Sequence, residues 1–235
     1  MKFGKRTHFD DDFMRQNLMG PSCLRLIDEL TTRMNLQSAM RVLDLGCGTG
    51  LTSIFLAQEF GVQVFATDLW ISPSENYARI RQFGLEDRVI PIHGEAHVLP
   101  YAHGYFDAAV SIDAYTYFGA APDYLDTHLI PLVKKGGTIA ASIPGLQWDL
   151  TDGVPEVLKP FWTDDINFYS GTWWKARWAQ SSHITITDCF LHNCHNEAWK
   201  DWLQCDNPYA QRDIAMIEAE DGKYFDTIGL IATVK

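Results

Sequence analysis

The sequence predicts an α/β fold in which seven strands form a doubly wound, mostly parallel sheet with an antiparallel edge strand. Between about residues 22 and 142, short apolar runs alternate with stretches of helical length, which is typical of parallel strands joined by helical crossovers. A glycine-rich segment follows the first apolar run, and a carboxylate, Asp68, ends the second. After residue 142 the alternation stops and tryptophans become frequent.

The parallel part of the sheet can be followed element by element. A helix is expected from Ser22, which can cap its N-terminus, to about Met34. A later helix is expected to end in a basic turn with a glycine stop at Lys134–Gly137, because cations and a following glycine favour a helix C-terminus. Strands are expected at 41–45, 63–67, 89–93, 106–112 and 138–142, and helices between them at 52–60, 73–83 and 123–133.

The tryptophan-rich segment is expected to be an insertion over the ligand-binding edge of the sheet, helical around Trp173–Ala179. Its tryptophans allow three interpretations: core packing, an aromatic box for a cationic acceptor, or an exposed patch for dimerisation. The segments Phe9–Gly20 and Trp148–Trp178 are expected to fold together as a mobile lid. The sheet is expected to resume at 184–191 and to end at 225–234, after two helices. One domain is thus expected over 1–235, with an N-terminal helical cap (1–35), a ligand-binding core (36–143), a lid or substrate insertion (144–181) and a C-terminal completion of the sheet (182–235).

Composition limits the classes of partner. With 235 residues, 46% of them hydrophobic, the chain can bury a substantial core. Its net charge of −11 and the lack of a basic stripe argue against nucleic acid and favour neutral or cationic small molecules. No apolar run is long enough to span a bilayer, and no signal peptide is recognisable. The five irregularly spaced cysteines indicate reduced thiols, so we expect a cytoplasmic protein, with a homodimer as one option.

The glycine-rich segment Val42–Gly50 reads as a strand, a tight turn and a helix start. The dinucleotide fingerprint G-x-G-x-x-G would need a glycine at position 51, which is Leu51. The third glycine is instead Gly50. Gly46 lets the chain leave the strand, Gly48 lets the backbone approach a ligand, and Gly50 permits close helix packing. The helix N-terminus would then face an anionic group of the ligand.

A G-x-G-x-G loop preceded by Asp44 resembles the first motif of the class I S-adenosylmethionine-dependent methyltransferases. Three further segments are similar to motifs of that family, and the resemblance covers residues 36–143. The nearest pattern is that of the small-molecule enzymes of the ubiquinone-biosynthesis and cyclopropane-synthase-like group. The three segments are His93–Ala96, with Glu95 where Asp is usual; Phe106–Asp113; and the Gly-Gly turn in Leu132–Thr138, with Lys where Pro is frequent.

The resemblance implies a Rossmann-like fold, S-adenosylmethionine as cofactor and S-adenosylhomocysteine as product. In it, Asp44 would accept from the ammonium group, Asp68 from the ribose hydroxyls and Glu95 from the adenine amino group. Asp68 fits the N-cap of a helix equally well, and Trp70 fits either an adenine-covering or a core position. The implied cofactor-binding residues are Asp44, Gly46, Cys47, Gly48, Gly50, Asp68, Leu69, Trp70, Glu95, Ala96, Ser111 and Asp113.

Transfer of a methyl group from a sulfonium is an in-line displacement, so the protein mainly has to align the reactants. A protic acceptor also needs a base, and the candidates after the fourth strand are Asp113, Tyr115 and Tyr117. Ordinary loop packing explains the two tyrosines equally well. The alternatives are a non-catalytic cofactor-binding or sensor protein and, from another class, a dinucleotide-dependent oxidoreductase. Leu51 and the lack of a Tyr-x-x-x-Lys pair count against the oxidoreductase.

A compact group of metal-ligating residue types occurs at His192–His195. On a strand end, His192 and Cys194 can converge, whereas His195 points elsewhere. Because no second pair of ligands stands nearby in the sequence, we expect no metal site.

Overall fold

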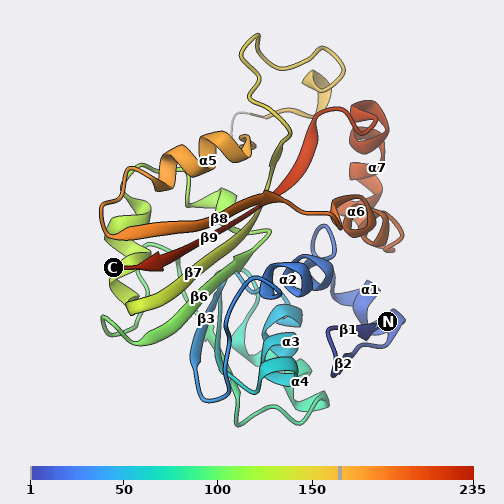
Figure 1. Ribbon diagram of the computed structural model, residues 1–235. Coiled ribbons are helices and arrows are strands. Elements are labelled where there is room, and N and C mark those ends of the chain that lie inside the picture. Colours follow the sequence, from blue (N-terminus) through green and yellow to red (C-terminus); the bar gives the residue numbers. More distant parts are fainter. Residues whose placement is uncertain (1, 164–165) are drawn as a thin grey trace.

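The computed structural model describes residues 2–163 and 166–235. Seven strands form one sheet: β3 (Arg41–Leu45), β4 (Gln63–Asp68), β5 (Val89–His93), β6 (Phe106–Ile112), β7 (Val133–Leu146), β8 (Ile184–Leu191) and β9 (Phe225–Val234). Their order is β5-β4-β3-β6-β7-β9-β8 (Figure 1). All neighbours from β5 to β7 are parallel, and β9 is antiparallel to both β7 and β8. The predicted mostly parallel sheet with an antiparallel edge is therefore confirmed.

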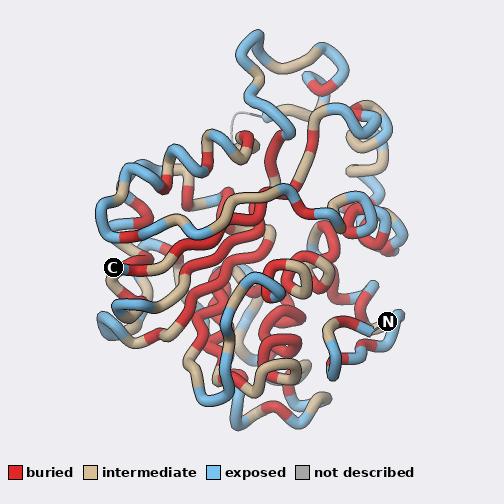
Figure 2. The backbone as a smooth tube through the Cα atoms, viewed as in Figure 1, coloured by how far each residue is buried: buried red, intermediate tan, exposed pale blue. Residues whose placement is uncertain are grey.

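Helices cover both faces of the sheet (Figure 1). The helices α2 (Cys23–Thr31), α3 (Leu51–Phe60), α4 (Pro73–Gln82) and α6 (His195–Leu203) pack on one face, and α5 (Gly171–Trp178) packs on the other. Each face of the sheet has its own hydrophobic core, and successive residues of a strand point to opposite faces. Val42 therefore belongs to the core on the side of α2 and α3, and Leu43 to the core on the side of α5. The inner strands β3, β4, β6, β7 and β9 are mostly buried (Figure 2), as expected for a sheet covered on both sides, whereas the edge strands β5 and β8 are mostly half-buried or exposed.

Local signals in the sequence set the helix ends. Ser72 and Glu75 form a reciprocal capping box at the start of α4. Ser170 caps α5 by accepting a hydrogen bond from the backbone N–H of Trp173. Helix α3 begins after Gly50 and ends at Gly61, both with positive φ, which glycine adopts without steric cost. The helix α7 (Pro208–Glu220) has proline in its first turn.

The N-terminal region contains a small hairpin in addition to helices. The strands β1 (Lys2–Phe3) and β2 (Thr7–His8) pair with each other, and α1 (Asp11–Asn17) follows, capped by Asp10. None of these three elements was expected individually from the sequence. None of the helices in the described part of the chain has both the length and the apolar character that a membrane-spanning helix needs.

The structure corrects the expected helix end at Lys134–Gly137. The helical turns η2 (Leu125–Leu129) and η3 (Ile130–Leu132) stop before these residues, which belong to β7. Phe106 of β6 pairs with Val133 and Ala108 pairs with Thr138. The four residues Lys134–Gly137 therefore lie opposite a single residue of β6 and form a bulge. Gly136 has φ 77° there, and the ammonium group of Lys134 pairs with Asp107.

The tryptophan-rich insertion contributes to the core. Trp174 and Trp178 are fully buried in the core opposite α2 and α3, whereas Phe9 and Met14 belong to the core on the α2 face. The buried parts of the two segments predicted to form one lid therefore lie on opposite faces of the sheet, and the lid itself stays a prediction. Core packing accounts for these two tryptophans, whereas Trp148 is exposed. The remaining elements are the short turns η1 (Tyr115–Tyr117) and η4 (Lys159–Phe161).

Candidate functional site

A cavity opens at the carboxyl ends of β3, β4 and β6, the edge of an α/β sheet where ligands bind. The loops after β3, β4, β5 and β6 each contribute to its lining, and residues before and in α2 close it from the N-terminal side. Ten of the predicted site residues line the cavity: Gly46, Cys47, Gly48, Asp68, Leu69, Trp70, Glu95, Ala96, Asp113 and Tyr117. Among the described lining residues, four predicted ones are missing: Asp44, Gly50, Ser111 and Tyr115.

The loop after β3 is fixed against the end of β4. The backbone N–H groups of Gly46 and Cys47 donate to the carbonyl of Thr67, at 2.8 and 3.2 Å. Gly46 has φ 74°, and a Cβ placed on it would lie 2.4 Å from the Cβ of Ala114. Both the backbone conformation and the space around position 46 therefore require glycine.

Asp68 holds three backbone N–H groups. Its Oδ2 accepts from Gly48 at 2.8 Å, and its Oδ1 accepts from Trp70 at 2.8 Å and from Ile71 at 2.9 Å. It stabilises the turn before α4 without being the N-cap, which is Ser72. Because a carboxylate has about four acceptor positions, one position on Oδ2 is left for a ligand hydroxyl. The structural and the ribose-binding interpretations are thus compatible.

Asp44 lies beneath the glycine loop and is fully buried. Its Oδ2 accepts from the hydroxyls of Thr52 and Ser53, both at 2.6 Å, whereas its Oδ1 has no hydrogen-bond partner among the described residues. Burial raises the pKa of Asp44 to about 6, and the charge of Asp68 acts in the same direction. A buried carboxylate oxygen without a partner indicates a missing donor, such as an ammonium group or a bound water molecule.

The mouth of the cavity is apolar and aromatic. Leu69 and Trp70 are exposed, and the rings of Trp70 and Tyr117 meet edge to face with centroids 5.2 Å apart. Trp70 is therefore not a core residue. Glu95 also reaches this region, where its Oε1 bonds to Nδ1 of His97 at 2.6 Å. The hydrogen bonds from His97 lower the pKa of Glu95, which keeps it ionised.

Asp113 follows β6 and lies in the lining of the cavity beside Gly20. It has φ 59°, an uncommon conformation for a residue other than glycine, and its N–H donates to the carbonyl of Ser142 at 2.8 Å. A Cβ on Gly20 would lie 2.3 Å from its Oδ2. Burial raises the pKa of Asp113 to about 7, with a further contribution from the charge of Asp213. Its carboxylate receives no hydrogen bond from any described group.

The three candidate bases have different surroundings. Asp113 faces the cavity and Tyr117 stands exposed at its mouth, but Tyr115 is fully buried. The ring of Tyr115 packs 5.8 Å from Trp174 and 5.7 Å from Trp178, centroid to centroid, on the side of the core away from the cavity. Tyr115 therefore supports the loop after β6 from below, and only Asp113 lies inside the cavity with a pKa near neutrality.

The sequence did not reveal the N-terminal part of the site. Asn17, Met19, Gly20 and Cys23 line the cavity, and the carbonyl of Asn17 accepts a hydrogen bond from the hydroxyl of Thr49 at 2.6 Å. These residues precede the first predicted strand and match no motif. The only local signal was the Met19-Gly20-Pro21 turn, whose glycine makes room for Asp113.

Comparisons with known proteins agree with this geometry. Residues 42–137 match the family model described as a methyltransferase domain. The methyltransferase GfsG of Streptomyces halstedii is 29% identical over 140 residues, which cover 59% of this chain and 50% of that protein. The norajmaline N-methyltransferase of Rauvolfia serpentina is 32% identical over 97 residues, covering 38% of this chain and 32% of that protein. The chain thus spans half or less of the length of these two relatives.

Solved structures share the fold at low identity. The geranyl diphosphate C-methyltransferase of Streptomyces coelicolor A3(2), in complex with Mg²⁺, geranyl diphosphate and S-adenosylhomocysteine, has a TM-score of 0.71 at 16% identity, covering 88% of this chain and 77% of that one. The [4+2]-cyclase SpnF has a TM-score of 0.70 at 16% identity, covering 98% and 87%. The matched family model and the cavity at the glycine loop therefore agree with the resemblance of residues 42–137 to the methyltransferase domains of the class I S-adenosylmethionine-dependent enzymes.

Proposed function

We propose that the chain is an enzyme that transfers a methyl group from S-adenosylmethionine to a small-molecule acceptor. The observation that carries this proposal is that one cavity joins the glycine loop at Gly46–Gly48 to the half-buried carboxylate of Asp113. Bound there, the cofactor supplies a methyl group on an electrophilic sulfonium for in-line displacement. The residues of the chain hold the reactants in line and receive the acceptor's proton.

The cofactor side of the cavity would be formed by the loops after β3, β4 and β5. The unpartnered Oδ1 of Asp44 supports a role in holding the ammonium group through water, because Asp44 itself lies beneath the loop. The remaining acceptor position of Asp68 suits a ribose hydroxyl, and Leu69 is an apolar neighbour for the adenine ring. Gly50 and Ser111 would act indirectly, by starting α3 and by packing within β6.

The acceptor side points to a neutral or cationic molecule with an apolar part. Among the described residues that line the cavity, none is Lys or Arg, whereas three are carboxylates. Met19, Cys23, Tyr117 and Phe118 supply apolar surface near Asp113. An acceptor hydroxyl or amine could give its proton to Asp113, whose pKa near 7 suits a general base at neutral pH. We also propose a cytoplasmic location and expect no nucleic-acid partner. The homodimer stays a prediction.

The proposal is tested by binding and turnover with the purified chain. Calorimetry is expected to show binding of S-adenosylmethionine and S-adenosylhomocysteine but not of NAD, because Leu51 replaces the third glycine of the dinucleotide fingerprint. Incubation with S-adenosylmethionine carrying an isotope-labelled methyl group and a pool of metabolites is expected to yield a labelled product. Binding without any labelled product would favour the sensor alternative, and binding of NAD would contradict the cofactor assignment.

Asp68→Ala is expected to weaken binding of S-adenosylmethionine by about 1.5–3 kcal/mol, the usual contribution of hydrogen bonds to a charged group. Calorimetry of the variant measures this loss. Ser72→Ala is the matched control, because it breaks the capping box of α4 but removes no cavity residue. If the control loses as much affinity as Asp68→Ala, the effect comes from a loosened turn and not from a contact with the ribose.

A further inference from the structure

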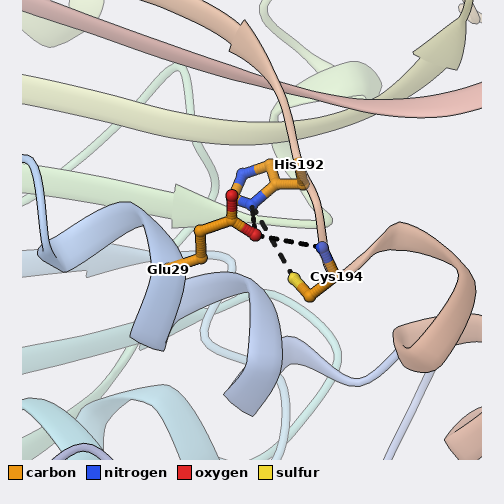
Figure 3. A group of neighbouring side chains, drawn as sticks. All are labelled: Glu29, His192 and Cys194. Atoms are coloured by element: carbon orange, nitrogen blue, oxygen red, sulfur yellow. Dashed lines mark hydrogen bonds and ion pairs between the residues drawn. The ribbon is translucent and has the colours of Figure 1, made fainter.

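Three side chains of metal-ligating types meet between α2 and the turn that joins β8 to α6 (Figure 3). Glu29 comes from α2, and His192 and Cys194 come from the turn. Nδ1 of His192 lies 3.5 Å from Oε2 of Glu29 and 3.9 Å from Sγ of Cys194, and all three ligand atoms lie within 4.8 Å of one another. Ligands of a tetrahedral zinc ion, with bonds of about 2.0–2.3 Å, stand roughly 3.3–3.6 Å apart. The cluster is therefore close to the required spacing.

Neighbouring groups orient two of the three ligands. The hydroxyl of Ser142 is 2.9 Å from Nε2 of His192, so Nδ1 is the ring nitrogen directed at the cluster. Oε1 of Glu29 accepts from the backbone and side-chain N–H groups of Asn193, at 3.0 and 2.7 Å. Oε2 accepts from the backbone N–H of Cys194 at 3.0 Å and keeps a further acceptor position. Such outer hydrogen bonds are what a metal site needs to hold its ligands in place.

The cluster is reached from the surface and is separate from the cofactor cavity. A shallow pocket lined by Arg25, Asp28, Glu29, Thr32 and Cys194 opens beside it, and none of these residues lines the cofactor cavity. His192, in contrast, is buried. An ion could therefore enter on the side of Glu29 and Cys194, keep a water molecule as its fourth ligand, and leave the cofactor site untouched.

We propose that Glu29, His192 and Cys194 form a binding site for a divalent transition-metal ion, with zinc as the preferred ion. Thiolate and imidazole ligands select zinc over magnesium and calcium, which prefer oxygen. On binding, the Cys194 thiol releases its proton to solvent and the sulfur bonds to the ion, so the thiolate and the Glu29 carboxylate balance its two positive charges. The ion would tie α2 to the turn between β8 and α6.

The proposal revises the expectation of no metal site. That expectation rested on the absence of a second pair of ligands near His192 and Cys194 in the sequence. Glu29 stands far away in the sequence and reaches the cluster only because α2 packs beside α6. His195 takes no part, as predicted, because its Nδ1 is 2.9 Å from the hydroxyl of Thr227.

The test uses the full chain after treatment with a chelator. Titration with Co²⁺ is expected to show one bound ion with a thiolate-to-cobalt charge-transfer absorption, which Zn²⁺ then removes by displacement. Zn²⁺ is also expected to raise the midpoint of thermal unfolding, because it binds only the folded cluster. The affinity for S-adenosylmethionine is expected to stay the same with and without Zn²⁺, so this test is independent of the proposed function.

Variants identify the ligands. Cys194→Ser is expected to lose the charge-transfer absorption and at least about 100-fold in Zn²⁺ affinity. Loss of a residue that only hydrogen-bonds to a ligand already costs up to about 100-fold, so loss of a direct ligand should cost at least as much. Cys189→Ser is the matched control, because Cys189 is a half-buried thiol of β8 outside the cluster. Retained absorption and affinity in Cys194→Ser, or no bound ion in the unmodified chain, would overturn the proposal and leave Glu29 as a cap for the turn.

A measurement without substitution covers the case in which Cys194→Ser does not fold. Zn²⁺ is expected to slow alkylation of Cys194 in the unmodified chain, measured by mass spectrometry of its peptides, while alkylation of Cys189 keeps its rate. Equal rates at Cys194 with and without Zn²⁺ would contradict the site.

Discussion

Gly46→Ala is expected to abolish binding of S-adenosylmethionine and to lower the free energy of unfolding by about 2–5 kcal/mol. The left-handed conformation at φ 74° costs a residue with a side chain about 1–2 kcal/mol. The added Cβ would lie 2.4 Å from the Cβ of Ala114, and forcing atoms into a packed site costs a further 1–3 kcal/mol or so. Because Ala114 follows Asp113, relief of this clash would move both the glycine loop and the loop that carries Asp113, and both line the cavity. Calorimetry and denaturant unfolding measure the two losses.

Gly136→Ala separates the cost of the left-handed backbone conformation from the cost of the clash with Ala114. Gly136 has φ 77°, close to that of Gly46, but apart from its two chain neighbours no described residue comes within 4 Å of a Cβ placed on it. This variant should show the backbone cost alone and bind the cofactor normally, since the bulge at Gly136 is not part of the cavity. Normal cofactor binding by Gly46→Ala would mean that the loop after β3 does not contact the cofactor.

Asp113→Asn is expected to reduce methyl transfer by about 10²–10⁴-fold to a protic acceptor, the usual contribution of a general base. The same variant is expected to be more stable than the unmodified chain at pH 8, by up to about 4 kcal/mol. The sign follows from the raised pKa of Asp113, about 7 in the folded chain against a reference of 3.8. Folding favours the protonated form, so the ionised carboxylate destabilises the fold increasingly from pH 4 to pH 7, and fully above pH 7.

The measurements are unfolding at pH 4 and pH 8 and the pH dependence of kcat/KM. The difference in stability between Asp113→Asn and the unmodified chain should vanish near pH 4, where both side chains are neutral. Activity of the unmodified chain should rise with pH and level off above about 7. Asp213→Asn, which removes a nearby negative charge, should move this rise to lower pH. A pH-independent rate, or an active Asp113→Asn variant, would exclude Asp113 as the base.

The sequence predicted the parallel half of the sheet because its signals are local. Each strand from 41 to 112 is a short apolar run between turn residues, and the loops after parallel strands necessarily meet at one edge. Asp68 and Asp113, both at strand ends, were therefore predicted to lie in one site, and the cavity contains both. The bulge at Lys134–Gly137 was missed because lysines followed by glycines favour a helix end as much as a bulge in a strand.

The remaining features depend on contacts between distant segments, which no local pattern encodes. Tyr115 was a candidate base by position, but Trp174 and Trp178 enclose its ring. The N-terminal wall at Asn17 and Gly20 forms only when that segment crosses the glycine loop. Glu29 meets His192 for the same reason, through the packing of α2 on the far half of the chain.

The position of β9 has a consequence for synthesis of the chain. β9 lies between β7 and β8, and within the described residues it is the only sheet partner of β8. Both neighbours precede β9 in the sequence and therefore leave the ribosome earlier, and α6 and α7 lengthen the interval between β8 and β9. The growing chain can therefore assemble the strands from β5 to β7 as they emerge, but it displays the bare edge of β7 until Phe225–Val234 arrives. During this interval the unpaired edge of β7 can pair with a strand of another chain, which makes it the main aggregation risk of the partly synthesised protein.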